Sequence, residues 1–211
     1  MIDIVTEINA TRREVEAGRD GADEARSVRL RRRYDATIED VWDACTSPER
    51  VARWFLPVTG DLRPGGSYQL EGNAGGEILR CEPPRLLRVT WVFGDAPASE
   101  VEVRLSPGDH DDTVFELEHT MHVTPLWAEF GPGALGVGWD GALLGLSLHL
   151  SGEPATDRQE WPRSADGREF FAKSSRAWGA AHEAAGASAA EAGAAADNTT
   201  RFYTGETQPE G

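Results

Sequence analysis

The feature that most constrains the fold of this sequence is a series of short alternating segments between residues 64 and 121. Apolar and polar side chains alternate within each segment, as in residues 99–105 (SEVEVRL), which is typical of strands with one buried face. Turn residues recur about every ten positions, as in residues 64–66 (PGG) and 73–76 (NAGG), and connect antiparallel neighbours. The series therefore predicts an antiparallel meander with one apolar face.

A strand and two short helices precede the meander. Residues 27–34 alternate with period two and predict the first strand. Thr37 is followed three residues later by Asp40 and then by apolar positions, so Thr37 is the expected N-cap of a helix. Residues 47–49 (SPE) begin a second helix that runs to Trp54.

One long apolar helix follows the meander and a loop at residues 125–133. From about residue 135 to residue 150, apolar side chains form one stripe that consists of Trp139, Leu143, Leu146 and Leu150. Such a stripe can cover the apolar face of the sheet. The order of elements predicts an α+β fold, in which a curved antiparallel sheet wraps around a long C-terminal helix.

The chain is expected to have one main domain, residues 26–152, because 211 residues leave little room for a second one. Residues 1–25 are predicted to form a helical appendage that ends in a mobile connector at residues 18–21. The residues at helical spacing in it are Ile4, Ile8, Thr11 and Val15.

Residues 153–211 are predicted to form a linker, a C-terminal amphipathic helix and a loose tail. Phe170, Phe171 and Trp178 lie on one face of the helix, and the alanine-rich residues 184–196 are expected to extend it. The loose tail is expected to begin at Asp197.

The charge balance and the cysteine count exclude several classes of protein. The formal net charge is −15, which repels phosphate backbones, so no nucleic-acid partner is expected. Cys45 and Cys81 have no CxxC spacing and are expected to be packed thiols. No export signal is visible, and the longest apolar run, residues 134–150, is too short and too polar for a membrane span. We expect a cytoplasmic protein.

The motifs that bind cofactors or metals lack their required context. Two GxGxxG matches within residues 131–141 have no strand directly before them and no βαβ unit around them. His119 and His122 are three positions apart on a strand and point to opposite faces, so they cannot share one metal ion. We therefore expect no cofactor and no metal, we assign no catalytic residue, and we favour a protein that is not an enzyme.

Residues 27–151 contain a series of short motifs: 32–36 (RRYDA), 41–42 (VW), 47–49 (SPE), 54–55 (WF), 76–79 (GEIL), 83–86 (PPRL), Trp91 and 138–139 (GW). Together they resemble the activator of Hsp90 ATPase homologue-like branch of the START-like, or SRPBCC, superfamily. The resemblance implies a helix-grip fold with a cavity between sheet and helix, which in many relatives holds a hydrophobic or amphipathic small molecule. It implies no single activity, because relatives include ligand carriers, hormone receptors, polyketide cyclases and chaperone cofactors.

Three polar side chains fall on the apolar face of the sheet: Arg32, Glu77 and His119. A buried charge needs a partner, because burial of a lone charge is costly. One interpretation is an internal Arg32–Glu77 ion pair with His119 bonded to backbone or water. The other is the polar end of an apolar pocket that orients a ligand carboxylate, hydroxyl or carbonyl. The rest of that pocket is expected to be lined by Trp54, Trp91, Phe93, Phe115, Leu117, Trp139 and Leu143.

The leading hypothesis is a protein that binds a small hydrophobic or amphipathic molecule in this pocket, without covalent catalysis. A first alternative is an enzyme of the polyketide cyclase or aromatase type, with His119 as the acid/base and Arg32 stabilising an enolate or carboxylate. A second is a chaperone-cofactor or stress-response module that acts through an outer surface, which the resemblance alone suggests. A homodimer, in which the C-terminal helix swaps onto a second chain, stays open as well.

Overall fold

The computed structural model describes residues 2–17, 25–154, 156–157 and 160–205. Within these residues, eight strands form one antiparallel sheet in the order β1-β2-β8-β7-β6-β5-β4-β3. The strands are β1 (Thr11–Ala17), β2 (Ala25–Tyr34), β3 (Val58–Gly60), β4 (Ser67–Leu70), β5 (Gly75–Glu82), β6 (Leu86–Trp91), β7 (Ser99–Pro107) and β8 (Thr113–His122). Consecutive strands from β3 to β8 are neighbours, which confirms the predicted meander.

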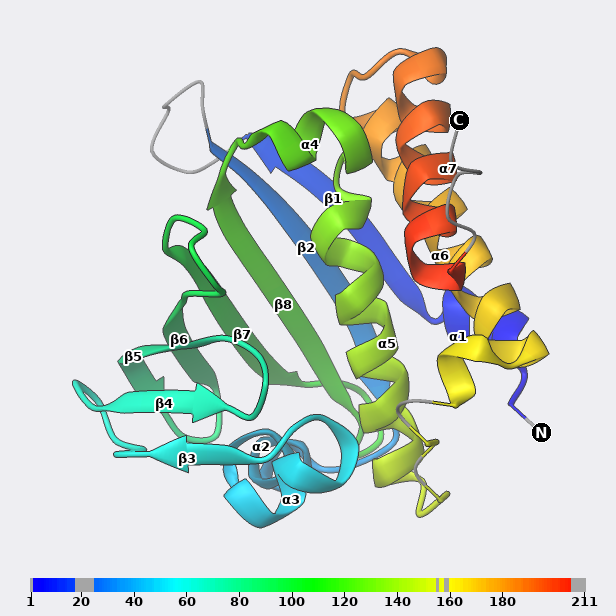
Figure 1. Cartoon of the computed structure of the whole chain (residues 1–211). Helices are drawn as coiled ribbons and strands as arrows, with labels where there is room; N and C mark the ends of the chain where they lie inside the picture. The colour runs from blue at the N-terminus through cyan, green and yellow to red at the C-terminus, as the bar shows by residue number, and fades with distance from the viewer. Residues whose placement is uncertain (1, 18–24, 155, 158–159, 206–211) are drawn as a thin grey trace.

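Helices cover one face of the sheet (Figure 1). They are α1 (Ile4–Asn9), α2 (Ile38–Thr46), α3 (Pro48–Trp54), α4 (Pro125–Phe130), α5 (Gly133–Leu150), α6 (Ala165–Ala184) and α7 (Ala189–Thr204), with a short 3-10 helix, η1 (Trp161–Arg163). Helix α5 packs against β2, α6 packs against α5 and β1, and α7 packs against α6 and α4. The predicted α+β fold, a sheet gripping a long helix, is confirmed.

The core lies between α5 and the strands that it crosses. Val28 and Leu30 of β2 and Leu117 of β8 are buried on the inner face of the sheet. Leu143 and Leu146 of α5 are buried in the same cluster. Full burial of side chains of this size contributes about 1.5–3 kcal/mol each, so the predicted apolar stripe of α5 is a main source of stability.

The two short helices begin where the sequence predicts. The hydroxyl of Thr37 accepts a hydrogen bond from the backbone N–H of Asp40, which caps α2. Pro48 lies at the first position of α3, where its missing N–H leaves no bond unmade, and α3 ends at Trp54. These helices carry Cys45 and Trp54 to one end of the sheet.

The N-terminal segment differs from its prediction. Helix α1 ends at Asn9, and Thr11–Ala17 forms β1, which pairs with β2 along its whole length. Ile4 and Ile8 are buried as their helical spacing implies. From Thr11 onward, the backbone groups form hydrogen bonds with β2, so this segment is a strand although its side chains have helical spacing. The connector predicted at residues 18–21 lies outside the described residues.

The C-terminal third contains more helix than the sequence predicts. Residues 125–133 were expected to be a loop, but most of them form α4. The alanine-rich stretch forms α7, not an extension of α6, because Gly186 adopts a φ of +106° and Ser188 starts a new helix with a capping box to Glu191. Residues 197–204, expected to be loose, belong to α7, whereas residues 206–211 lie outside the described part of the chain.

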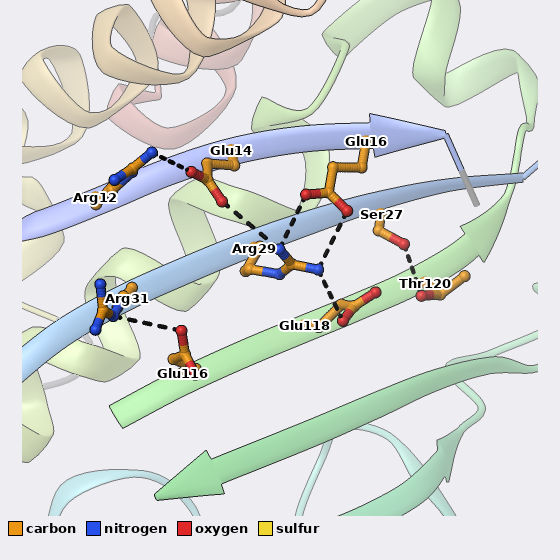
Figure 2. Close-up of polar contacts among 9 residues, drawn as sticks. All are labelled: Arg12, Glu14, Glu16, Ser27, Arg29, Arg31, Glu116, Glu118 and Thr120. Atoms are coloured by element: carbon orange, nitrogen blue, oxygen red, sulfur yellow. Dashed lines mark hydrogen bonds and ion pairs between the residues drawn. The ribbon is translucent and has the colours of Figure 1, made fainter. Parts of the chain in front are cut away.

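The face of the sheet away from α5 carries rows of opposite charge (Figure 2). Arg29 of β2 reaches Glu16 of β1 at 2.9 Å and Glu118 of β8 at 3.4 Å. Arg31 lies 3.3 Å from Glu116 in the same arrangement. Cross-strand pairs of opposite charge contribute about 0.2–1 kcal/mol each, so these rows help to hold β1, β2 and β8 in register.

Candidate functional site

A pocket of about 180 Å³ lies between the inner face of the sheet and helices α2, α3 and α5, and it is partly open to solvent. Its lining is almost entirely apolar. Most of the side chains predicted to line a cavity meet here: Trp54, Trp91, Phe115, Leu117, Trp139 and Leu143. The curved sheet and the single helix that crosses it therefore leave a hollow that side chains do not fill.

Aromatic rings form one continuous wall of this pocket. Trp54 stacks on Phe55 with ring centroids 5.5 Å apart, and Phe55 stacks on Trp139 at 6.0 Å. Trp139 in turn meets Trp91 at 5.1 Å, with the ring planes tilted by 57°. The wall runs from the end of α3 across α5 to the end of β6. Aromatic pairs at such separations contribute about 0.5–1.5 kcal/mol beyond their burial, which favours a wall that is already formed without ligand.

Three polar side-chain groups in the lining, those of Trp54, Tyr68 and Trp139, bond to the protein itself. The hydrogen bonds run from Trp54 Nε1 to the Ala44 carbonyl (2.9 Å), from the Tyr68 hydroxyl to the Thr90 carbonyl (2.8 Å) and from Trp139 Nε1 to Nδ1 of His119 (3.1 Å). Burial raises the pKa of the Cys45 thiol to about 12 and also raises the pKa of the Cys81 thiol, so both remain uncharged. The pocket therefore presents ring faces, methyl groups and neutral thiols.

His119 lies behind the aromatic wall, where 2% of its surface is exposed. Its Nδ1 accepts the indole N–H of Trp139, so the proton of the neutral ring is on Nε2. That Nε2–H donates to the hydroxyl of Ser99 at 2.8 Å, and this hydroxyl donates to the carbonyl of Trp91 at 3.0 Å. Both ring nitrogens are thus used in a relay that joins β8, β7, β6 and α5.

The protonation of His119 predicts an acid-sensitive component of stability. Burial lowers the pKa of His119 from 6.5 to about 4, because the charged ring would lose its hydration. Between these two values the unfolded state binds the proton and the folded state does not, so acidification favours unfolding. We expect the free energy of unfolding to fall by about 3 kcal/mol as pH decreases through this range, and the contribution to be constant above it.

Urea unfolding at a series of pH values tests this component. Many carboxylates titrate in the same range, so the informative quantity is the difference between the wild type and His119→Gln, which has no imidazole. The difference should shrink as pH falls from 7 to about 4. Parallel curves for the two proteins would contradict the assignment of a neutral, buried His119.

Three predicted pocket residues lie elsewhere. Arg32 points to the inner face but lies 2.7 Å from Glu7 of α1 and bonds the Ser147 hydroxyl, and it does not line the pocket. The predicted Arg32–Glu77 ion pair is wrong, because Ile78 takes the buried position of β5 and Glu77 is exposed. Phe93 is 56% exposed, since β6 ends at Trp91 and the chain turns away from the sheet.

Other lining residues were missed from the sequence. Phe55 completes the aromatic wall, and Cys45, Cys81 and Tyr68 also face the pocket. Tyr68 and Leu70 alternate with polar residues in the sequence, and this alternation could have placed Tyr68 on the inner face of the sheet. No local pattern distinguishes the two thiols or Phe55 from ordinary core residues.

Among the described residues, no group of three His, Cys, Asp or Glu side chains is arranged to hold a metal ion. Over the same residues, no helix combines the length and the apolar character that a bilayer crossing requires.

Solved structures similar to this chain include CalU16 from Micromonospora echinospora. Its crystal structure is 42% identical over 82% of this chain and 98% of CalU16, with a TM-score of 0.68. The solution NMR structure of CalU16 gives 40% identity, 83% and 97% coverage, and the same TM-score. DynU16, described as a protein of the dynemicin biosynthetic locus, is 26% identical over 61% of this chain and 48% of its own, with a TM-score of 0.55.

The family comparison covers the part of the chain that builds the pocket. The model of the activator of Hsp90 ATPase homolog 1-like protein family matches residues 35–147, which include α2, α3, the meander and most of α5. A comparison with curated proteins found no match. With the family match, the CalU16 likeness and the sheet that grips α5, the chain belongs to the activator of Hsp90 ATPase homolog 1-like family of SRPBCC-type proteins.

Proposed function

We propose that this protein binds a small, uncharged, aromatic molecule without covalent chemistry in the pocket between the sheet and α5. The observation that carries the proposal is a hollow of about 180 Å³ whose wall is a row of stacked rings. A charged ligand would lose its hydration there, and the indole N–H groups of Trp54 and Trp139 already bond to the protein. A neutral ring system would gain contacts with the aromatic wall and would lose little hydration free energy.

The size of the pocket supports a ligand, or a ligand portion, of one or two rings. An apolar protein cavity of roughly 150 Å³ stays dry and binds benzene, so a hollow of about 180 Å³ can hold a fused bicyclic ring. The pocket is partly open to solvent, so a larger molecule can place its remaining part outside.

The relatives support a small-molecule role and leave the ligand unnamed. Members of the family bind ligands or act as polyketide cyclase-like proteins. DynU16 belongs to a biosynthetic locus, where small molecules are made. The acid/base alternative gains no support from His119, because both of its nitrogens are engaged inside the wall and burial lowers its pKa to about 4. Binding is therefore the function that the geometry supports best.

Isothermal titration calorimetry with two matched probes tests the proposal. 2-Naphthol is a neutral bicyclic ring, and 2-naphthalenesulfonate has the same rings with a fixed charge. We expect 2-naphthol to bind at one site per chain and the sulfonate to bind at least about tenfold more weakly, because its charge finds no partner in the pocket. Equal affinity for both probes, or no heat from 2-naphthol, would refute the proposed function.

A pocket-filling variant locates the binding. Val103 lines the pocket, and Val103→Phe should occupy part of the hollow and weaken 2-naphthol binding at least about tenfold. Val123→Phe makes the same exchange at a position that is 40% exposed and outside the lining, and it should bind like the wild type. If both variants bind like the wild type, the probe sits elsewhere.

A further inference from the structure

We infer that His119 is the positioning residue of the pocket: it fixes the ring of Trp139 in the orientation that a ligand meets. This inference rests on the proposed function, since it concerns how the same pocket selects its ligand. His119 does not line the pocket, so it would act through Trp139 and not by touching the ligand.

The contacts of His119 couple three structural elements at one point. From β8, its ring lies 6.0 Å from the ring of Trp139 on α5 and 5.9 Å from the ring of Trp91 on β6, edge to face with both. Trp139 and Trp91 are themselves 5.1 Å apart, so the three rings form a closed triangle. Each of the three rings therefore packs against the other two.

The hydrogen bonds of His119 also restrict the orientation of the Trp139 ring. An indole ring can pack in several rotamers, but its N–H is a single donor that needs an acceptor when buried. Nδ1 of His119 is the acceptor for Trp139, and its direction fixes which face of the indole turns toward the pocket. On the other side, Nε2 donates to Ser99, whose hydroxyl holds the carbonyl of Trp91. One imidazole thus bonds the indole of Trp139 directly and, through Ser99, the backbone carbonyl of Trp91.

The surroundings of His119 show that hydrogen bonding, not packing alone, is its role. Its neighbours in the sheet are Val28 on β2 and Val101 on β7, both buried and apolar. An aliphatic side chain would suit this environment at least as well as an imidazole with a desolvated ring. What such a side chain cannot supply is the acceptor for Trp139 and the donor for Ser99.

This difference gives opposite expectations for two variants. His119→Leu keeps an apolar side chain but removes both hydrogen bonds, so the Trp139 ring should turn and 2-naphthol should bind about tenfold more weakly. His119→Gln keeps an acceptor and a donor, so its affinity should stay within about threefold of the wild type. If His119 only fills space, the order is reversed, because leucine is the better core residue.

A ligand-free measurement checks the same point. Coupled indoles give a near-ultraviolet circular dichroism band, which should weaken in His119→Leu and persist in His119→Gln. Should His119→Leu fail to fold, Trp139→Phe removes the N–H but keeps a ring, and it should lower the affinity to a similar extent. Where His119→Leu folds, the double variant His119→Leu/Trp139→Phe should bind about as weakly as either single variant, because the bond that both residues share is already absent in each.

The outcomes separate this inference from the proposed function. If the wild type does not bind 2-naphthol, the proposed function fails. If the wild type binds and His119→Leu binds equally well with an unchanged circular dichroism band, the pocket stands and the positioning role of His119 is overturned. A lower affinity in His119→Leu, with wild-type behaviour in His119→Gln, supports both.

Discussion

Replacing Asp140 by alanine is expected to lower the free energy of unfolding by about 3–5 kcal/mol, the typical effect of breaking a buried ion pair. Asp140 lies on α5 and is 3% exposed. Its Oδ2 accepts from Nε of Arg13 at 2.9 Å, from the hydroxyl of Ser174 at 2.5 Å and from the indole N–H of Trp178 at 3.0 Å. One carboxylate oxygen therefore joins α5 to β1 and α6.

The expected loss comes mainly from the partners left behind. The side chain of Arg13 is 7% exposed, so its charge would remain buried, with the carbonyls of Ile8 and Thr11 as its remaining acceptors among the described residues. The indole of Trp178 would lose its acceptor as well. An unpaired buried group costs more than the bond itself contributes, so a single truncation should affect the N-terminal strand and the C-terminal helices together.

Urea unfolding of Asp140→Ala measures this effect. Asp95→Ala, at an exposed position in the turn after β6, is the matched control and should change stability by no more than about 0.5 kcal/mol. A loss below about 1 kcal/mol for Asp140→Ala would mean that the ion pair is solvated in solution and does not join these elements.

Gly136→Ala is expected to destabilise the protein by about 3 kcal/mol, although a single methyl group is added. A Cβ at Gly136 would lie 2.1 Å from the indole of Trp178. Trp178 is 1% exposed and its N–H is bonded to Asp140, so the ring cannot move aside without breaking that bond. Alanine normally stabilises a helix interior by about 1 kcal/mol relative to glycine, so the sign here is reversed by packing.

Thermal and urea unfolding of two glycine variants separate the effects. Gly193→Ala, in α7, places its Cβ in open space, so it should show the ordinary stabilising effect of up to about 1 kcal/mol. Equal stability changes in Gly136→Ala and Gly193→Ala would show that α6 does not approach α5 as closely as the structure has it.

The sheet and α5 could be predicted because their signals are local. Alternation with period two in β7 and the apolar stripe of α5 are properties of single segments, and both are borne out. Strand β1 could not be predicted in the same way. Its residues have helical spacing, and what makes them a strand is the partner β2, which a local pattern does not reveal.

The sequence predicts which face of the sheet carries the polar residues of the candidate site, but it does not predict which residues they bond. Parity correctly puts Arg32 and His119 on the inner face of the sheet, and the rule that buried polar groups need partners correctly demands bonds for both. Parity does not give the position along the sheet. Arg32 therefore meets Glu7 at the α1 end instead of Glu77, and His119 meets an indole instead of backbone or water.

The most direct test of the proposed pocket is to locate a bound ring. Nuclear Overhauser contacts between 2-naphthol and the isotope-labelled protein report which side chains lie within about 5 Å. We expect contacts to the indole of Trp139, the indole of Trp54 and the methyl groups of Leu143, which line the hollow. Contacts confined to exposed apolar side chains such as Leu126 and Phe202, or no contacts at all, would contradict the account.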